Sequence, residues 1–345
     1  VQKIREAANR LKCQNNLKQI GLAAHNYENV NGQLPPGYLG PIPNETGWAW
    51  PEYRGFEGTA PRTLPFRGVQ NVTAFAFLLP YLEQNNVHSQ LQLNWDLNTL
   101  GTSWYANPAN VVVAQSSIRT FLCPSDNLEA ERSGSAPFSR IAEHFYSVPL
   151  GTNPNGSLVW MVQNDWSQSY PNLGGSNYAA VLGAAGSGSN TQVLTQGSPA
   201  YPVAVPNGWS QYEGVFSNRS RTQLTHITDG TSNTLLFGEI TGMWGNQRGY
   251  FRPWISSSVS TTWGGLTNWP DWYHFHSRHS GIVQFCFADG AVRALRQAGG
   301  VYFPYSYGFP TNRTSTASEF GTPWWLFLEL GGMRDGGTRA TSDLF

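Results

Sequence analysis

Charged residues are scarce in this sequence. Asp, Glu, Lys and Arg make up 12% of its 345 residues, about half the share in a typical globular protein. The 21 basic and 21 acidic side chains balance, so the chain lacks the net positive field on which nonspecific nucleic-acid binding depends. We therefore exclude a nucleic-acid partner. The aromatic content of 14% also excludes an intrinsically disordered chain.

Signature motifs of common enzyme classes are missing as well. The sequence contains no Gly-x-Ser-x-Gly, no His-Glu-x-x-His, no P-loop and no Gly-x-Gly-x-x-Gly after a strand. We predict no catalytic residue and no enzymatic activity. No run of about 18 apolar residues occurs, so no segment of the given sequence is predicted to span a membrane.

Gly, Pro and aromatic residues are abundant in place of charge. The 37 Gly and 22 Pro indicate a loop-rich β protein that works outside the cytoplasm. Beyond residue 117, short β-type runs alternate with turn residues, which predicts an antiparallel sheet and not βαβ units. The expected strands are 118–122, 158–162, 178–182, 235–237 and 283–287. Helical spacing predicts helices at 74–93, with Pro80 as a kink or boundary, and at 324–330 after Thr322 and Pro323.

Residues 1–30 are predicted to form one helix. They contain no Pro and hold five basic against two acidic side chains. Two apolar stripes follow helical spacing on different faces: Val1, Ile4, Ala8 and Leu11, then Cys13, Leu17, Ile20, Ala24 and Tyr27. We expect Leu17, Ile20, Ala24 and Tyr27 to pack on the sheet and the N-terminal part to project or be exposed. No capping residue precedes the first apolar position, so we expect the helix to begin upstream, the alternative being a chain that starts at an arbitrary domain edge.

Four segments resemble the large prepilin-like secreted proteins of planctomycete-type bacteria, which end in a His-x9-Asp-Gly motif. The segments are residues 1–23 (VQKIREAANRLKCQNNLKQIGLA), 121–126 (FLCPSD), 227–234 (ITDGTSNT) with Gly238-Glu239, and 279–290. The residues at family-motif positions, for which we expect structural roles, are Cys123, Asp229, Gly230, Asn233, Glu239, His279, Asp289 and Gly290.

The resemblance implies an α+β, pilin-like fold. A long N-terminal helix, residues 1–32, would pack on an antiparallel β-sheet, and its hydrophobic upstream half is absent from this sequence. Residues 33–345 would form a single β-rich head domain with large, loop-rich aromatic insertions. The only membrane contact would be made through the absent upstream helix.

The resemblance also implies a structural subunit of an extracellular pilus- or pseudopilus-like filament or cell-surface assembly. Its partners would be further copies of itself, joined through the N-terminal helix and the aromatic loops. The chain would be exported as a membrane-anchored prepilin, trimmed by a prepilin peptidase, and assembled by a type II secretion or type IV pilus-like machinery. We therefore expect it outside the cell or on the surface of a bacterium.

The alternative function is a cell-surface solute- or glycan-binding module, because the same family carries an older interpretation as solute-binding proteins. Tryptophans near Gly and Pro could stack on sugar rings, although Trp is also common in cores and interfaces. These residues are Trp48, Trp50, Trp209, Trp244, Trp254, Trp263 and Trp269. Rings clustered in a concavity would favour binding, and rings on opposite faces would favour assembly.

Three cysteines cannot all pair. Cys13 and Cys123 fall at family-motif positions and are expected to form a disulfide that joins the helix to the head and favours an oxidising compartment. Cys286 lies in an apolar run and is expected to be a core thiol. Connectivity cannot be derived from sequence alone, so three reduced thiols remain the alternative.

Two segments could hold a cation. On a strand, His274 and His276 would point to the same side, with His279 nearby. No Cys or Glu stands at ligand spacing from them, so we predict no metal site. We expect His279 to form a structural hydrogen bond near a hairpin turn at Asp289-Gly290. Residues 229–233 superficially resemble a calcium loop, with Glu239 ten residues beyond Asp229, yet they lack its alternating oxygen ligands. A turn that bonds its own backbone is favoured over bound calcium, and no cofactor is predicted.

Overall fold

The structure is a computed structural model with an α+β fold, as the sequence predicts. The residues that it describes, some by backbone alone, are 2–39, 70–99, 101–128, 143–149, 158–164, 172–183, 191–193, 203–204, 214–217, 219–244, 247–248, 252–256, 259–260, 262, 265–266, 274–297 and 326–336. The predicted helix start at Thr322 and Pro323 lies outside these ranges, as do most of the loop tryptophans.

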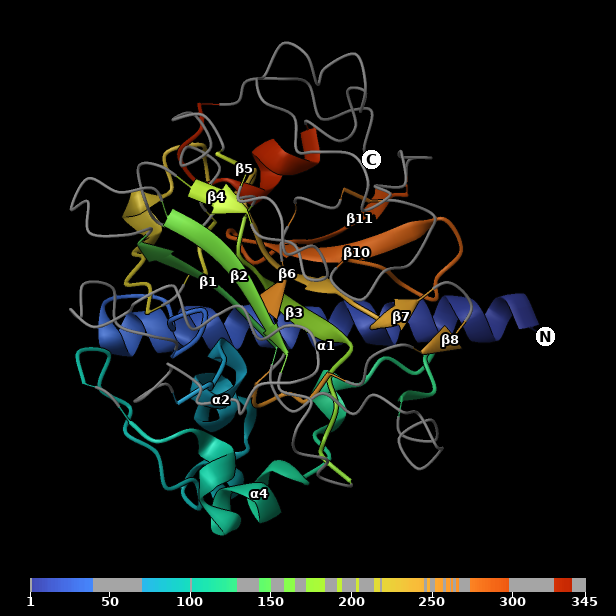
Figure 1. Ribbon diagram of the computed structural model, residues 1–345. Coiled ribbons are helices and arrows are strands. Elements are labelled where there is room, and N and C mark those ends of the chain that lie inside the picture. Colours follow the sequence, from blue (N-terminus) through green and yellow to red (C-terminus); the bar gives the residue numbers. More distant parts are fainter. Residues whose placement is uncertain are drawn as a thin grey trace.

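One continuous helix, α1 (Gln2–Asn31), crosses the molecule, and its N-terminal end lies at the periphery (Figure 1). This confirms the predicted helix. It ends where Gly32 adopts a φ of 70° and donates its N–H to the Glu28 carbonyl at 2.7 Å. Among the described helices, none is long and apolar enough to cross a membrane.

The two apolar stripes of α1 have opposite environments. The buried side of the helix consists of Cys13, Asn16, Leu17, Ile20, Gly21, Ala23 and Ala24. In the first stripe, Ile4 is 75% exposed and Leu11 is 61% exposed. The N-terminal part of α1 therefore presents apolar side chains to solvent, while the remainder of the helix contributes to the core.

The helical region predicted at 74–93, with Pro80 as a kink or boundary, consists of three short segments, the last of which ends at His88. They are α2 (Ala74–Leu78), the 3-10 helix η2 (Leu79–Leu82) and α3 (Asn85–His88). Pro80 lies in the 3-10 turn, and Glu83 leaves helical geometry with a φ of 57°. Tyr27, which was expected on the sheet, instead packs edge-on against Phe77 and Tyr81 of this region, with ring centroids 6.2 and 5.7 Å away. That part of the packing prediction was wrong.

The central sheet has five strands in the order β11–β10–β6–β3–β9. Their bounds are β3 (Tyr178–Val181), β6 (Leu235–Glu239), β9 (Val259–Ser260), β10 (Ile282–Phe287) and β11 (Val292–Arg296). Neighbouring strands are antiparallel except β3 and β9, which are parallel. The strands predicted at 178–182, 235–237 and 283–287 are confirmed, and the sheet is mostly antiparallel.

Further strands lie outside the central sheet. A four-stranded sheet contains β1 (Glu143–Pro149), β2 (Leu158–Asn164), β4 (Thr191–Val193) and β5 (Val203–Ala204), and a hairpin pairs β7 (Met243–Trp244) with β8 (Gln247–Arg248). The strand predicted at 158–162 lies within β2. The described helical segments not yet named are η3 (Trp104–Ala106), α4 (Pro108–Ala114), η4 (Arg119–Phe121), η6 (Leu224–His226) and residues 326–331.

The strand predicted at 118–122 is wrong, because this segment is the 3-10 helix η4. Its backbone groups bond to a loop and not to a neighbouring strand. Asn177 donates its N–H to the Phe121 carbonyl at 2.8 Å, and its side-chain oxygen accepts the Cys123 N–H at 2.9 Å. These bonds fix the chain next to α1 at the point where Cys123 must sit.

The central sheet is covered on both faces. Along β10, Gln284 and Cys286 face α1, since Gln284 donates to the Arg10 carbonyl and Cys286 lies against Gly21. The alternate residues Val283, Phe285 and Phe287 pack in a second apolar cluster with Leu326, Phe327 and Leu330 of the segment 326–331. This alternation is the period of two expected for a strand with two covered faces. Any side chain on the α1 face of β6 or β10 is thereby directed toward the helix.

Candidate functional site at the helix–sheet junction

A disulfide joins α1 to the segment after η4. It links Cys13 to Cys123 across 110 residues, with the two Cα atoms 5.3 Å apart. This is the pairing that the resemblance predicts. Cys286 is buried and unpaired, and burial raises the pKa of its thiol to about 12. Cys286 is therefore an unreactive core thiol.

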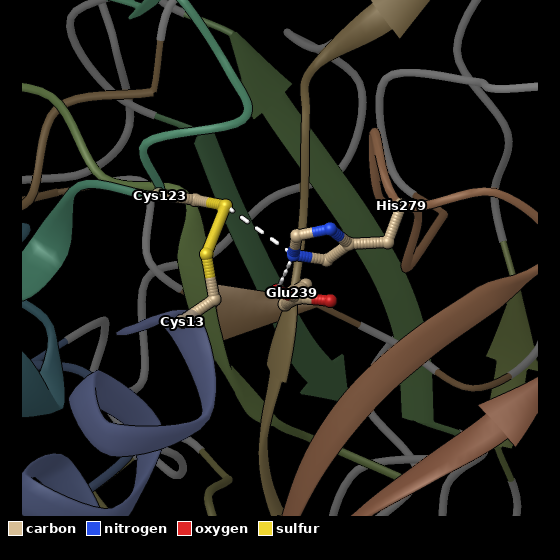
Figure 2. A group of neighbouring side chains, drawn as sticks. All are labelled: Cys13, Cys123, Glu239 and His279. Atoms are coloured by element: carbon tan, nitrogen blue, oxygen red, sulfur yellow. Dashed lines mark hydrogen bonds and ion pairs between the residues drawn. A yellow bond between two sulfur atoms is a disulfide. The ribbon is translucent and has the colours of Figure 1, made fainter. Parts of the chain in front are cut away.

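His279 lies directly against the disulfide. Its Nε2 atom is 3.6 Å from Cys123 Sγ and 3.3 Å from Glu239 Oε1, and its Nδ1 atom is 2.5 Å from Glu6 Oε1. Figure 2 shows the ring edge turned toward Cys123 and Glu239. The side chain of Glu239 is 2% exposed and that of Glu6 is 39% exposed. An imidazole thus lies between a buried and a half-exposed carboxylate, next to a covalent bond between helix and head.

Local contacts hold the members of this cluster in place. Ser277 Oγ accepts the backbone N–H of His279 at 3.1 Å. Glu239 ends β6, and its Oε2 atom accepts the Gln284 N–H of the neighbouring strand at 2.8 Å. Ser125, two residues beyond Cys123, donates its hydroxyl to Glu6 Oε2 at 2.9 Å. The sheet therefore positions Glu239, and the Cys-Pro-Ser-Asp segment positions Glu6.

The charges of the cluster favour an imidazolium. Burial alone would lower the pKa of His279, but the hydrogen bonds and negative charges of Glu239 and Glu6 together raise it above its ordinary value. Burial alone would raise the pKa of Glu6, but hydrogen bonds from His279 and Ser125 and the positive charges of His279 and Arg10 together lower it. The ion pair between α1 and the head is accordingly stable between these two pKa values.

Asp126 completes the Cys-Pro-Ser-Asp segment. Its Oδ2 atom accepts a hydrogen bond from the Asn177 side chain at 2.5 Å, and its Oδ1 atom pairs with Arg278 at 3.4 Å. Arg278 immediately precedes His279. The ion pair therefore fixes the loop before β10 to the segment that carries Cys123.

The other family-motif residues form a second group next to α1, at the far end of β10. Asp289 and Gly290 make the turn between β10 and β11, where Gly290 has a φ of 75°. Lys18 of α1 donates to the Gly290 carbonyl at 2.7 Å. The Asp289 N–H bonds to the Thr231 carbonyl at 2.9 Å, which brings the 229–234 turn alongside the hairpin. Both groups of motif residues thus contact α1 directly or through one neighbour.

The 229–233 segment bonds backbone groups through its side chains. Asp229 accepts the N–H groups of Asp335 and Gly336 at 2.7 and 3.0 Å, one on each carboxylate oxygen. Asn233 donates to the Asp229 carbonyl at 3.1 Å, and Gly230 has a φ of 95°. Glu239, a candidate calcium ligand for this loop by its position in the sequence, lies instead beside His279.

The three histidines do not come together. His279 precedes β10 whereas Asp289 follows it, so the expected hydrogen bond of His279 near that hairpin turn is not formed. His276 lies 3.4 Å from the Thr241 hydroxyl, and burial, with a smaller effect of Arg278, lowers its pKa to about 4. His274 is buried.

Glu6 is the member of the site that sequence reasoning missed. A signal for it exists, because Glu6 precedes Cys13 by seven residues and therefore lies on the same face of α1, two turns away. Its partner could not be inferred, since His279 stands 273 residues further along the chain.

Comparison with protein families matches residues 2–298 to the family described as "Protein of unknown function (DUF1559)", with the short name SBP_bac_10. Neither a curated protein nor a solved structure matches the chain. The matched range begins with α1 and ends just after β11, so it includes every residue of the junction site.

Proposed function

We propose that this chain, which belongs to the DUF1559 family, is a structural subunit of an extracellular pilus- or pseudopilus-like filament or cell-surface assembly. In this proposal α1 serves as the element through which subunits associate. The head is the part that faces water, and the junction site transmits load between the two.

The division of α1 into two parts carries the proposal. All the buried residues of α1 lie from Cys13 onward, whereas Ile4 and Leu11 in the preceding part are exposed. Apolar side chains exposed on one helix are a surface that other helices can cover. An open groove of about 410 Å³ adjoins Leu11. It is lined by Ala7, Arg10, Leu11, Gln14, Gln284 and Ala294. A neighbouring subunit could bury this groove together with the exposed stripe.

The contacts at the junction suit a subunit that bears load. A disulfide at Cys13 and an ion pair at Glu6 attach α1 to segments far away in sequence. Lys18 adds a third attachment near the β10–β11 turn. A force applied to the N-terminal end of α1 would therefore reach the central sheet through a covalent bond instead of through helix packing alone.

Export and partners form a further part of the proposal, supported by the resemblance of residues 1–23 and not by any contact in the structure. The chain would be made as a membrane-anchored prepilin and processed by a prepilin peptidase. A type II secretion or type IV pilus-like machinery would assemble it on the bacterial surface. A disulfide is consistent with an oxidising compartment.

The alternative, a solute- or glycan-binding module, has no described aromatic site in its favour. Of the tryptophans considered for sugar stacking, Trp254 is fully buried and donates to the Ser116 carbonyl at 3.0 Å. The side chains of the other six lie outside the described part of the chain.

Substitution of the exposed stripe in the natural full-length protein tests the proposal. Ile4→Glu and Leu11→Glu are expected to abolish filaments or a surface layer seen by electron microscopy of cells, with the head still folded. Val112→Glu is the matched control, because Val112 is 67% exposed and lies on α4, away from α1. A wild-type protein that stays monomeric at the cell surface while its head binds a defined sugar would replace this proposal with the binding module.

A further inference from the structure

We propose that, when the disulfide is reduced, Cys13, Cys123, Glu239 and His279 form a binding site for one Zn²⁺ ion. The disulfide and the metal are then two alternative ways of fastening α1 to the head. This inference is independent of assembly, because it concerns the redox state of a single chain.

The geometry provides four ligands without movement of the backbone. The two sulfur atoms, one carboxylate oxygen and one imidazole nitrogen all lie within 4.8 Å of one another, and all four residues are buried. Tetrahedral zinc with bonds of about 2.0 to 2.3 Å places its ligand atoms about 3.3 to 3.8 Å apart. Once the sulfur–sulfur bond is broken, small side-chain rotations are enough to reach this spacing.

The surroundings of His279 match those of a zinc ligand. Its Nδ1–H is directed at the Glu6 carboxylate, which leaves Nε2 facing Cys123 Sγ and Glu239 Oε1 at 3.6 and 3.3 Å. Histidines that bind zinc usually donate their other ring N–H to a carboxylate or carbonyl group, and this bond fixes the ring and the tautomer. Glu6 would have that role here.

Glu239 supplies a second, independent observation. Its Oε2 atom accepts the Gln284 N–H, and its Oε1 atom is fully buried, with the 3.3 Å ion-pair contact to His279 Nε2 as its contact with a cation-forming group in the described part of the chain. A buried carboxylate oxygen without a hydrogen bond is costly unless a cation is nearby. In the oxidised chain the imidazole of His279 is the partner of this oxygen, and in the reduced chain Zn²⁺ would be.

The donor set specifies the metal class. Two thiolates, one imidazole and one carboxylate are soft and borderline ligands, which suit Zn²⁺ and not Ca²⁺ or Mg²⁺. In the disulfide both sulfurs are bonded to each other and cannot ligate as thiolates. The site therefore exists only in the reduced chain.

Reduction can be written in balanced form with a water-soluble trialkylphosphine. The phosphorus gives two electrons to the sulfur–sulfur bond and becomes a phosphine oxide, taking its oxygen from water. The two protons of that water go to the two cysteines as thiols. Each thiol releases its proton to solvent when its sulfur binds Zn²⁺.

The test compares the oxidised chain with the chain reduced without oxygen by the phosphine. The reduced chain is expected to bind one Zn²⁺, at least about 100-fold more tightly than the oxidised chain, which lacks both thiolate ligands. Substitution by Co²⁺ should give thiolate-to-cobalt charge-transfer absorption and the visible bands of a tetrahedral ion. Glu239→Gln and His279→Gln should each weaken Zn²⁺ binding by about 10- to 100-fold.

Cys286→Ala is the matched control, because it removes the remaining thiol without touching the cluster, and its reduced form should bind Zn²⁺ as the wild type does. Equal, weak binding by the oxidised and reduced chains would overturn the proposal. So would cobalt bands that persist in Cys13→Ser/Cys123→Ser. If reduction unfolds the chain, Zn²⁺ must restore its near-ultraviolet circular dichroism, and failure to do so would also refute the site.

Discussion

Glu6, near the start of α1, and His279, just before β10, form an ion pair with Nδ1 and Oε1 2.5 Å apart. The pair spans 273 residues of sequence and lies beside the Cys13–Cys123 disulfide. Glu6 precedes Cys13, the first buried residue of α1, so the pair ties the more exposed N-terminal part of the helix to the head. The stability that this ion pair contributes depends on the charge of both partners, so it can be measured by varying the pH.

Stability at this junction is predicted to fall on both sides of a pH optimum. The pKa of His279 is raised above 6.5, so its contribution is complete below pH 6.5 and is lost as pH rises through the raised pKa. The pKa of Glu6 is lowered below 4.5, so its contribution is complete above pH 4.5 and is lost as pH falls through the lowered value. Thermal unfolding between pH 2 and pH 9 measures both limbs.

His279→Gln should remove the loss of stability on the alkaline side, whatever its effect on the level of stability. His226→Gln is the control, because His226 is exposed and outside the cluster. An alkaline slope that is the same in both variants would contradict the assigned role of His279.

Gly21 permits the close approach of α1 to β10, because a Cβ atom at this position would overlap Cys286 Sγ. In an exposed helix, Gly→Ala stabilises by about 1 kcal/mol. Here we expect Gly21→Ala to destabilise by about 1 to 3 kcal/mol, since both residues are buried and the strand cannot move away. Denaturant unfolding gives the free energy.

The double variant Gly21→Ala/Cys286→Ala tests the cause. Removal of the sulfur should make room for the new methyl group, so Gly21→Ala should cost much less in the Cys286→Ala background. If Gly21→Ala is stabilising on its own, the proposed contact is not the reason for glycine.

Much of the fold was predictable because periodicity is a local signal. The stripe Cys13, Leu17, Ile20 and Ala24 identified the buried face of α1, and the run 283–287 identified β10. The type of secondary structure was harder to predict for short apolar segments. At 118–122 the apolar pattern favoured a strand, but hydrogen bonds to Asn177 impose a 3-10 turn. Tertiary contacts outweighed local preference there.

The site was predictable only in part. Cys13, Cys123, Glu239 and His279 were each singled out by the resemblance, yet they come from four separate parts of the chain, and no spacing rule joins them. For this reason the metal argument from sequence did not consider these four residues together. It searched for ligands near His274 and His276, whereas the two sulfurs reach His279 through the packing of α1 and η4 on the sheet.

Loss of the disulfide is predicted to destabilise the chain by about 2 to 4 kcal/mol, because it closes a loop of more than a hundred residues. Cys13→Ser/Cys123→Ser should show this loss in denaturant unfolding with a chelator present. Cys286→Ser is the comparison for a thiol in the same core. Peptide mapping without reduction should recover Cys13 linked to Cys123 and Cys286 as a thiol. A reduced chain with unchanged stability would argue against the bridge.

Asp229 is predicted to hold residues 333–336, near the C-terminus, in place. Its two carboxylate oxygens accept the N–H groups of Asp335 and Gly336, and hydrogen bonds to a charged group contribute about 1.5 to 3 kcal/mol each. Each of these two amides loses one bond in Asp229→Ala, so its hydrogen exchange should speed up by about one to two orders of magnitude, at about 1.4 kcal/mol for each tenfold step. Asp229→Asn keeps one acceptor oxygen and should have an intermediate effect. Asp96→Ala is the control, because Asp96 caps an exposed turn elsewhere.

The response to calcium distinguishes the backbone-capping role of Asp229 from the calcium loop that residues 229–233 superficially resemble. Both carboxylate oxygens already accept backbone N–H groups, so the carboxylate has hydrogen-bond partners without a bound ion. Addition of Ca²⁺ or of a chelator should therefore leave the unfolding temperature and the exchange rates at 333–336 unchanged. A rise in unfolding temperature with Ca²⁺ that disappears in Asp229→Ala would show that the carboxylate binds the ion, and the backbone-capping role would then be wrong.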